Sequence, residues 1–125
     1  FGEKVGIACQ IKDDIFDYGT PNNIGKPTGI DIREQKMTLP LIYALDHSPP
    51  SIKAELKNIV KNQNENSAKI KRATDIVIEN GGIDYAYKIM KEYARDAISI
   101  LDNFPDSDAK ESLKSLVDYT MNREK

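Results

Sequence analysis

The stretch ACQIKDDIFDYG, from Ala8 to Gly19, places three aspartates within five positions of an otherwise apolar segment. On an α-helix, residues three, four and seven positions apart share one face. The polar residues with this spacing form one acidic stripe: Gln10, Asp13, Asp14 and Asp17. Most of the remaining circumference is apolar, with Lys12 as the exception, whereas a solvated surface helix has the opposite proportions. We therefore expect protein to surround most of this helix and the acidic stripe to face a cavity.

Such a cluster of carboxylates is energetically costly. Like charges one helical turn apart repel, and carboxylates without partners in a cavity either take up protons more readily or need a cation. Mg²⁺ prefers hard oxygen ligands and commonly shares one or two carboxylates with substrate phosphates. Asp13 and Asp17 could hold one such ion and leave coordination positions for a diphosphate. The stripe thus predicts a magnesium site, and the ordinary alternative is a solvated acidic patch.

Composition and charge narrow the class of protein. The 125 residues are enough for one compact domain, and a net charge of −2 gives no basic field for nucleic acid. No apolar run approaches the roughly 20 residues that a membrane span needs. The single cysteine, Cys9, cannot form an internal disulfide, which fits a reducing compartment, and we expect the cytoplasm. Because the chain opens on Phe1 inside a helical pattern, we expect a piece of a longer protein.

Helical patterns recur along the chain, while strand signals are poor, so we expect residues 1–125 to form a single all-α helical bundle. The pattern predicts six helices, over residues 1–18, 38–45, 51–61, 67–79, 83–103 and from 108 onward. Thr38, Ser51 and Ser107 are the expected N-caps, and Asn80-Gly81-Gly82 is expected to end the fourth helix. Residues 19–37, rich in glycine and proline, are expected to form a loop.

That expected loop carries cations close behind the acids. It includes IGKPTGIDIREQKMTLP, with Lys26 and Lys36 as its two lysines, Arg33 between them and Asp31 nearby. A lysine on a glycine-hinged loop can close over a bound anion. Gly25-Lys26 lacks the upstream glycine of a nucleotide P-loop, which excludes that motif. Acids for magnesium followed by lysines for phosphate indicate a site for a diphosphate ester.

With this all-α context, QIKDDIFD followed by GKPTGIDIREQKMTLPLIYAL resembles the second aspartate-rich motif of trans-isoprenyl diphosphate synthases and the segment after it. The medium- and long-chain polyprenyl group is the most similar. The segment GGIDYAYKIMKEYARDAISILDNFPDSDAKESLKSLVDY resembles the C-terminal helices of that family, so the resemblance covers essentially the whole chain. It implies the C-terminal part of the isoprenoid synthase fold. The implied activity is magnesium-dependent condensation of an allylic diphosphate with isopentenyl diphosphate to a polyprenyl diphosphate, in a homodimeric enzyme.

The resemblance also implies roles for individual residues. The metal ligands, which hold magnesium against the allylic diphosphate, would be Asp13, Asp14 and Asp17. The diphosphate-binding residues would be Lys26, Lys36 and Gln10, with Gln10 beside the reacting centre. Among these, Asp13 and Lys26 are the residues expected to be catalytic.

Two features depart from the family pattern. Cys9 stands where the family usually has a phenylalanine that packs near isopentenyl diphosphate. In addition, the family uses two aspartate-rich motifs and an arginine-rich isopentenyl diphosphate site, and this sequence holds only one such motif. We therefore expect the chain to be roughly the C-terminal third of a synthase and to be inactive alone.

Three alternatives stay open. A terpene cyclase shares the fold and the magnesium chemistry, but the GKPTGID and KMTLP segments favour a chain-elongating synthase. A non-catalytic subunit of a heteromeric prenyl synthase would gain nothing from repelling carboxylates, so the intact stripe and both lysines argue against it. A helical interaction module without a ligand is the third, and titration with magnesium and a diphosphate distinguishes it from the others.

Overall fold

The computed structural model describes residues 1–18 and 29–122. Helices dominate these residues, which confirms the all-α prediction. The described residues hold seven helices: α1 (Gly2–Phe16), α2 (Ile30–Arg33), α3 (Leu39–His47), α4 (Pro50–Asn62), α5 (Ser67–Glu79), α6 (Gly82–Leu101) and α7 (Asp108–Asn122). None of the helices in the described part of the chain is both long and apolar enough to cross a lipid bilayer.

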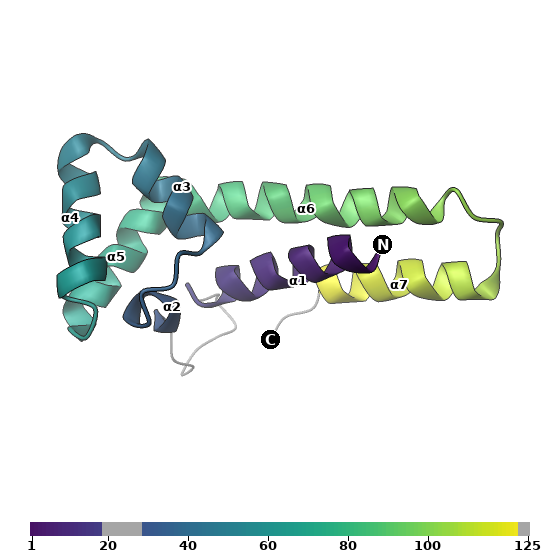
Figure 1. Ribbon diagram of the computed structural model, residues 1–125, viewed down its shortest axis with the longest axis horizontal. Coiled ribbons are helices and arrows are strands. Elements are labelled where there is room, and N and C mark those ends of the chain that lie inside the picture. The colour runs from purple at the N-terminus through teal and green to yellow at the C-terminus, as the bar shows by residue number, and fades with distance from the viewer. Residues whose placement is uncertain (19–28, 123–125) are drawn as a thin grey trace.

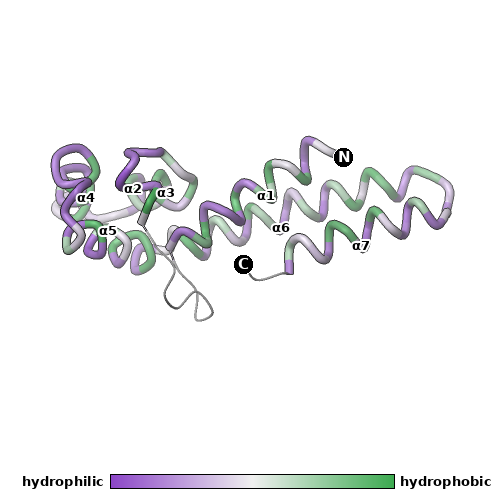
Figure 2. The backbone as a smooth tube through the Cα atoms, turned by 90° about the horizontal axis from the view of Figure 1, so that it is seen from below, coloured by the Kyte–Doolittle hydropathy of each residue, from purple (hydrophilic) through white to green (hydrophobic). Residues whose placement is uncertain are grey.

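The helices fall into two groups (Figure 1). The long helix α6 runs beside α1, and α7 folds back against both of them. At the other end of α6, helices α2 to α5 gather into a compact cluster of short helices. Hydrophilic and hydrophobic residues alternate along α6 and α7, as expected for helices that bury one face (Figure 2). The acidic stripe runs along α1, and the C-terminal end of this helix lies next to the short-helix group.

The additional helix is α2, which lies inside the segment that was expected to be a loop. It is a single turn, and only Ile32 among its residues is buried. Because one turn is too short to show a hydrophobic period, the sequence pattern could not reveal it. The prediction of a loop over residues 19–37 is therefore wrong for Ile30–Arg33, and residues 19–28 lie outside the described part.

The predicted helix starts are partly confirmed. Ser107 caps α7, since its hydroxyl accepts a hydrogen bond from the backbone N–H of Lys110 at 3.1 Å. Thr38 occupies the N-cap position of α3, but its side chain makes no capping hydrogen bond. Ser51 is not a cap: α4 begins at Pro50, where proline has no N–H group that needs a partner. The other differences are shifts of about two residues at helix ends, as at Phe16, His47 and Leu101.

Two glycines join α5 to α6, where the sequence predicted the end of a helix. Gly81 has φ 81°, a left-handed conformation that glycine adopts without strain. At Gly82, a Cβ atom would lie 2.6 Å from the backbone oxygen of Pro40 and 2.8 Å from Cγ1 of Val77. Only a residue without a side chain therefore lets α3, α5 and α6 meet this closely.

Buried side chains form two clusters, one in each group of helices. The α2–α5 core consists of Tyr18, Ile32, Leu41, Ala44, Leu56, Ile59, Val60, Ile70, Ala73, Ile76 and Val77. The α1–α6 core consists of Ala8, Ile11, Ile15, Ala86 and Met90. Because Tyr18 directly follows α1 but belongs to the α2–α5 core, the C-terminal end of α1 is fixed where the two groups meet.

Candidate functional site

Asp14 is the buried member of the acidic stripe, with 7% of its surface exposed. The side-chain amide of Gln10 donates a hydrogen bond to its Oδ1 atom at 3.1 Å. Burial raises the pKa of Asp14, the hydrogen bond from Gln10 and the charge of Lys36 lower it, and the charges of Asp13 and Asp17 raise it. A further positive charge nearby would therefore stabilise the ionised form of Asp14.

The rest of the stripe is less enclosed than expected. Gln10 and Asp13 are exposed, and Asp17 is half-buried. The described residues therefore do not enclose Gln10 and Asp13, and the expectation that the stripe faces a cavity stays a prediction. Among the described residues, hydrogen bonds join α2 to the stripe at its C-terminal end, where Asp17 lies.

Asp17 is bonded to the start of α2. Its Oδ1 accepts a hydrogen bond from the backbone N–H of Ile30 at 3.1 Å, and its Oδ2 accepts one from Asp31 at 3.0 Å. The backbone oxygen of Asp17 accepts a third, from the N–H of Gly29 at 2.9 Å. Three successive backbone N–H groups thus point at one aspartate, which ties the end of α1 to the segment that carries Asp31 and Lys36.

Asp31 and Lys36 complete the charged neighbourhood. Burial raises the pKa of Asp31, the charge of Asp17 raises it further, and the charge of Lys36 lowers it. The backbone N–H of Lys36 donates to the backbone oxygen of Asp31 at 2.8 Å. The charge of Lys36 thus lowers the pKa of two carboxyl groups from separate segments, Asp14 and Asp31.

Of the predicted diphosphate ligands, Gln10 bonds to Asp14, Lys36 is an exposed residue of the segment that follows α2, and Lys26 lies outside the described residues. The sequence interpretation assigned no role to Asp31. Its position in the segment GKPTGID, immediately before a buried isoleucine, is the signal that could have identified it.

Lys12 is the charged residue on the apolar side of α1, and its partners are at the end of α7. It is only 5% exposed. Its Nζ atom donates to the backbone oxygens of Thr120 at 2.7 Å and Met121 at 2.5 Å, and it lies 5.5 Å from the centre of the Phe16 ring. Because these carbonyls belong to the last turn of α7, the lysine satisfies acceptors that a helix end leaves without partners. Lys12 therefore fixes α7 to the helix that carries the aspartates.

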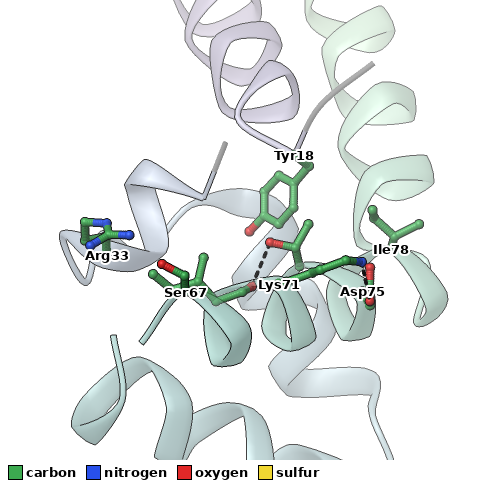
Figure 3. Close-up of a pocket in the computed structure, with 8 residues that line it drawn as sticks. Tyr18, Arg33, Ser67, Lys71, Asp75 and Ile78 are labelled. Carbon is green, nitrogen blue, oxygen red and sulfur yellow. Dashed lines mark hydrogen bonds and ion pairs between the residues drawn. The ribbon is translucent and has the colours of Figure 1, made fainter. Parts of the chain in front are cut away.

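A cavity of about 430 Å³ lies next to the end of α1, between Tyr18, α2 and α5. In the close-up of Figure 3, Tyr18 points toward α5, and Lys71 pairs with Asp75 at 3.4 Å. Burial raises the pKa of the Tyr18 hydroxyl, and the neighbouring Thr38 hydroxyl lowers it. Within residues 1–18 and 29–122, neither hydroxyl has a partner with full hydrogen-bond geometry.

The carboxylates suit a magnesium ion only as part of a shared site. Among the described residues, no group of three or more histidine, cysteine, aspartate or glutamate side chains is arranged to hold a metal ion. The stripe nevertheless offers hard oxygen donors, and Mg²⁺ is usually held by one or two carboxylates together with phosphate oxygens and water. The donor set therefore fits magnesium that is bound jointly with a diphosphate.

Comparison with known proteins gives the family of the chain. Residues 1–77 match the family model described as polyprenyl synthetase. The chain is similar to a probable mitochondrial hexaprenyl pyrophosphate synthase from Neurospora crassa, with 32% identity over 126 residues that cover 100% of this chain and 27% of the relative.

Solved structures show the same similarity. Geranylgeranyl pyrophosphate synthase from Bacteroides thetaiotaomicron superposes with a TM-score of 0.85 at 36% identity, covering 98% of this chain and 39% of that one. A polyprenyl synthase from Caulobacter crescentus, solved with calcium and isoprenyl diphosphate, superposes with a TM-score of 0.82 at 33% identity. The match covers 96% of this chain and 37% of that one. The chain belongs to the polyprenyl synthetase family and spans between 27% and 39% of the length of these relatives.

Proposed function

We propose that this chain is the part of a chain-elongating prenyltransferase that binds the metal and the allylic diphosphate. The whole enzyme would condense that allylic diphosphate with isopentenyl diphosphate to a polyprenyl diphosphate. The observation that carries the proposal is the arrangement at the end of α1, where the buried Asp14 follows the exposed Asp13 and Asp17 accepts the backbone N–H groups of Ile30 and Asp31 at 3.1 and 3.0 Å. A relative of this chain binds a divalent cation together with isoprenyl diphosphate, which supports the same use of the stripe.

In this proposal, the residues of the chain act by binding and orientation. Asp13 is exposed, so its carboxylate can offer oxygen atoms to a cation at the surface of α1, and the buried Asp14 is proposed as the second ligand. Lys36, whose backbone N–H bonds to the carbonyl of Asp31, is proposed to attract diphosphate oxygens, and Lys26 is the second lysine proposed for this role. Magnesium, when bound, would stabilise the negative charge that develops on the departing diphosphate. No side-chain nucleophile is needed.

The chain alone is proposed to lack part of the machinery. It spans about a third of the length of its relatives, and its sequence holds one aspartate-rich motif. Condensation would therefore need residues beyond this chain, in a protein that we expect to be a homodimer. Incubation of the 125-residue chain with allylic and isopentenyl diphosphates should give no product, and sustained turnover would contradict this part of the proposal.

Joint binding of magnesium and diphosphate is the direct test. We expect inorganic pyrophosphate with MgCl₂ to raise the melting temperature of the chain, and either compound alone to have little effect. At a hundred times the dissociation constant, the gain in stability is about 2.7 kcal/mol. The measurement is a thermal melt, followed by isothermal titration calorimetry.

Two variants provide the comparison. Asp13→Asn should remove the joint effect, because it deletes a charged oxygen ligand at nearly constant size. Glu111→Gln is the matched control, since Glu111 is an exposed acid in the first turn of α7. The proposal is wrong if pyrophosphate has no magnesium-dependent effect, or if both variants respond as the unaltered chain does.

A further inference from the structure

Asp17 differs from Asp14 in what its carboxylate bonds to. Asp13 is exposed, and Asp14 receives a side-chain amide on one oxygen. Asp17 instead uses both carboxylate oxygens on backbone N–H groups, those of Ile30 and Asp31. These partners lie 13 and 14 positions away in the sequence, so the contact is tertiary.

The position of those N–H groups is fixed independently of Asp17. Gly29, which precedes them, has φ 75°, and a Cβ atom on it would collide with the side chain of Ile70 on α5. Three positions after Gly29, Ile32 is completely buried in the α2–α5 core. The start of α2 is therefore held against α5. If the Asp17 carboxylate rotated away, this segment could not move with it and the hydrogen bonds would break.

We infer that Asp17 is a positioning residue, which anchors the α2 segment to α1, and that metal binding is left to Asp13 and Asp14. Hydrogen bonds from N–H groups to a carboxylate are about twice as strong as those between neutral groups. Rotating the Asp17 carboxylate toward a cation would weaken two of them together. The metal-binding part of this inference rests on the proposed function, whereas the anchoring part rests on the contacts alone.

The consequence for the site is geometric. Asp31 follows Ile30 directly, and the backbone N–H of Lys36 bonds back to the carbonyl of Asp31. Because residues 29–31 are held against α5, their bonds to Asp17 fix the end of α1 relative to them, and so set the place of Asp14 relative to Asp31.

Amide hydrogen exchange, measured by NMR on the 125-residue chain without metal or pyrophosphate, tests the anchoring. Asp17→Ala should speed exchange of the Ile30 and Asp31 amides roughly tenfold, since each loses a charged acceptor. Asp17→Asn keeps one acceptor oxygen, so one of the two amides should remain protected. Asp13→Asn is the matched control and should leave both amides unchanged, with circular dichroism showing that every variant keeps its helices.

Titration of the same variants with Mg²⁺ and pyrophosphate tests the division of roles. Asp13→Asn should weaken joint binding at least tenfold more than Asp17→Asn does. Unchanged exchange in Asp17→Ala, an equal rise in Asp13→Asn, or equal loss of binding in the two Asn variants would overturn the inference. If the unaltered chain binds no magnesium pyrophosphate but the exchange pattern holds, the proposed function fails and the anchoring by Asp17 is supported.

Discussion

The two ends of the molecule differ in how completely they bury their apolar surface. In the α2–α5 core, Leu41, Leu56 and Ile59 are fully buried among four short helices. Along α7, only Val117 and Lys110 are buried, while Leu116 and Tyr119 are more than half exposed. The short-helix end therefore has a core of its own, and the α7 end leaves apolar side chains uncovered. The acidic stripe lies on α1, which spans the border between them.

The largest effect expected from this difference is in stability. Leu56→Ala, in the α2–α5 core, should lower the free energy of unfolding by about 3 kcal/mol, because it removes fully buried methyl groups and leaves a cavity. Leu116→Ala, at an exposed site on α7, should change it by no more than about 0.5 kcal/mol. Urea denaturation measures both values. Equal losses would show that the two ends do not differ as described.

An intermediate effect is expected where α7 joins α1. Lys12→Met keeps the aliphatic stem but takes the ammonium donor away from the carbonyls of Thr120 and Met121. The loss should be about 1–3 kcal/mol, the usual cost when buried polar groups lose a partner. Urea denaturation gives the magnitude, and faster amide exchange confined to α7 gives the location.

The control for this variant is Lys88→Met on α6, where the lysine is exposed and the substitution removes the same charge. A similar loss in both variants would attribute the effect to net charge and not to the contact with α7.

The smallest effect concerns an exposed ion pair within the short-helix group. Arg72 on α5 donates hydrogen bonds to both carboxylate oxygens of Glu55 on α4, at 2.9 and 3.1 Å, and these bonds lower the pKa of Glu55 below 4.5. A lowered pKa in the folded state stabilises the fold above about pH 4.5, and that contribution is lost as the pH falls through the folded value. Because the pair is exposed, the contribution is small.

Arg72→Ala should return the pKa of Glu55 to its ordinary range and flatten the dependence of stability on pH below that point. A ¹³C NMR titration of the Glu55 carboxyl carbon provides the measurement. An unchanged titration midpoint in Arg72→Ala would show that the pair does not form in solution.

The parts of the fold that depend on local sequence could be predicted. The helical stripe, the left-handed glycine at Gly81 and the cap at Ser107 each depend on residues within a few positions of one another. The helix α2 was missed because its one turn is held by distant partners, Asp17 and the core around Ile32. No local pattern carries that information.

The candidate site shows the same division. The sequence indicated the acids and Lys36 as candidates, but it could not indicate their separate environments. The burial of Asp14 and the exposure of Asp13 depend on which helices pack against α1. Likewise, Lys12 was recognisable as an unusual charge on an apolar face, whereas its acceptors lie 108 and 109 positions further along the chain.

The contact made by Lys12 links the last helix to the aspartates in a way that matters for proteolysis. Lys12 directly precedes Asp13, and its two carbonyl acceptors lie within the last six residues of the sequence. Trimming by a carboxypeptidase past Thr120 would remove both acceptors without touching any residue of the stripe. Loss of these acceptors would free Lys12 and could shift the backbone of the neighbouring Asp13. Mass spectrometry should therefore show that the C-terminus of the 125-residue chain is intact before any metal affinity is interpreted.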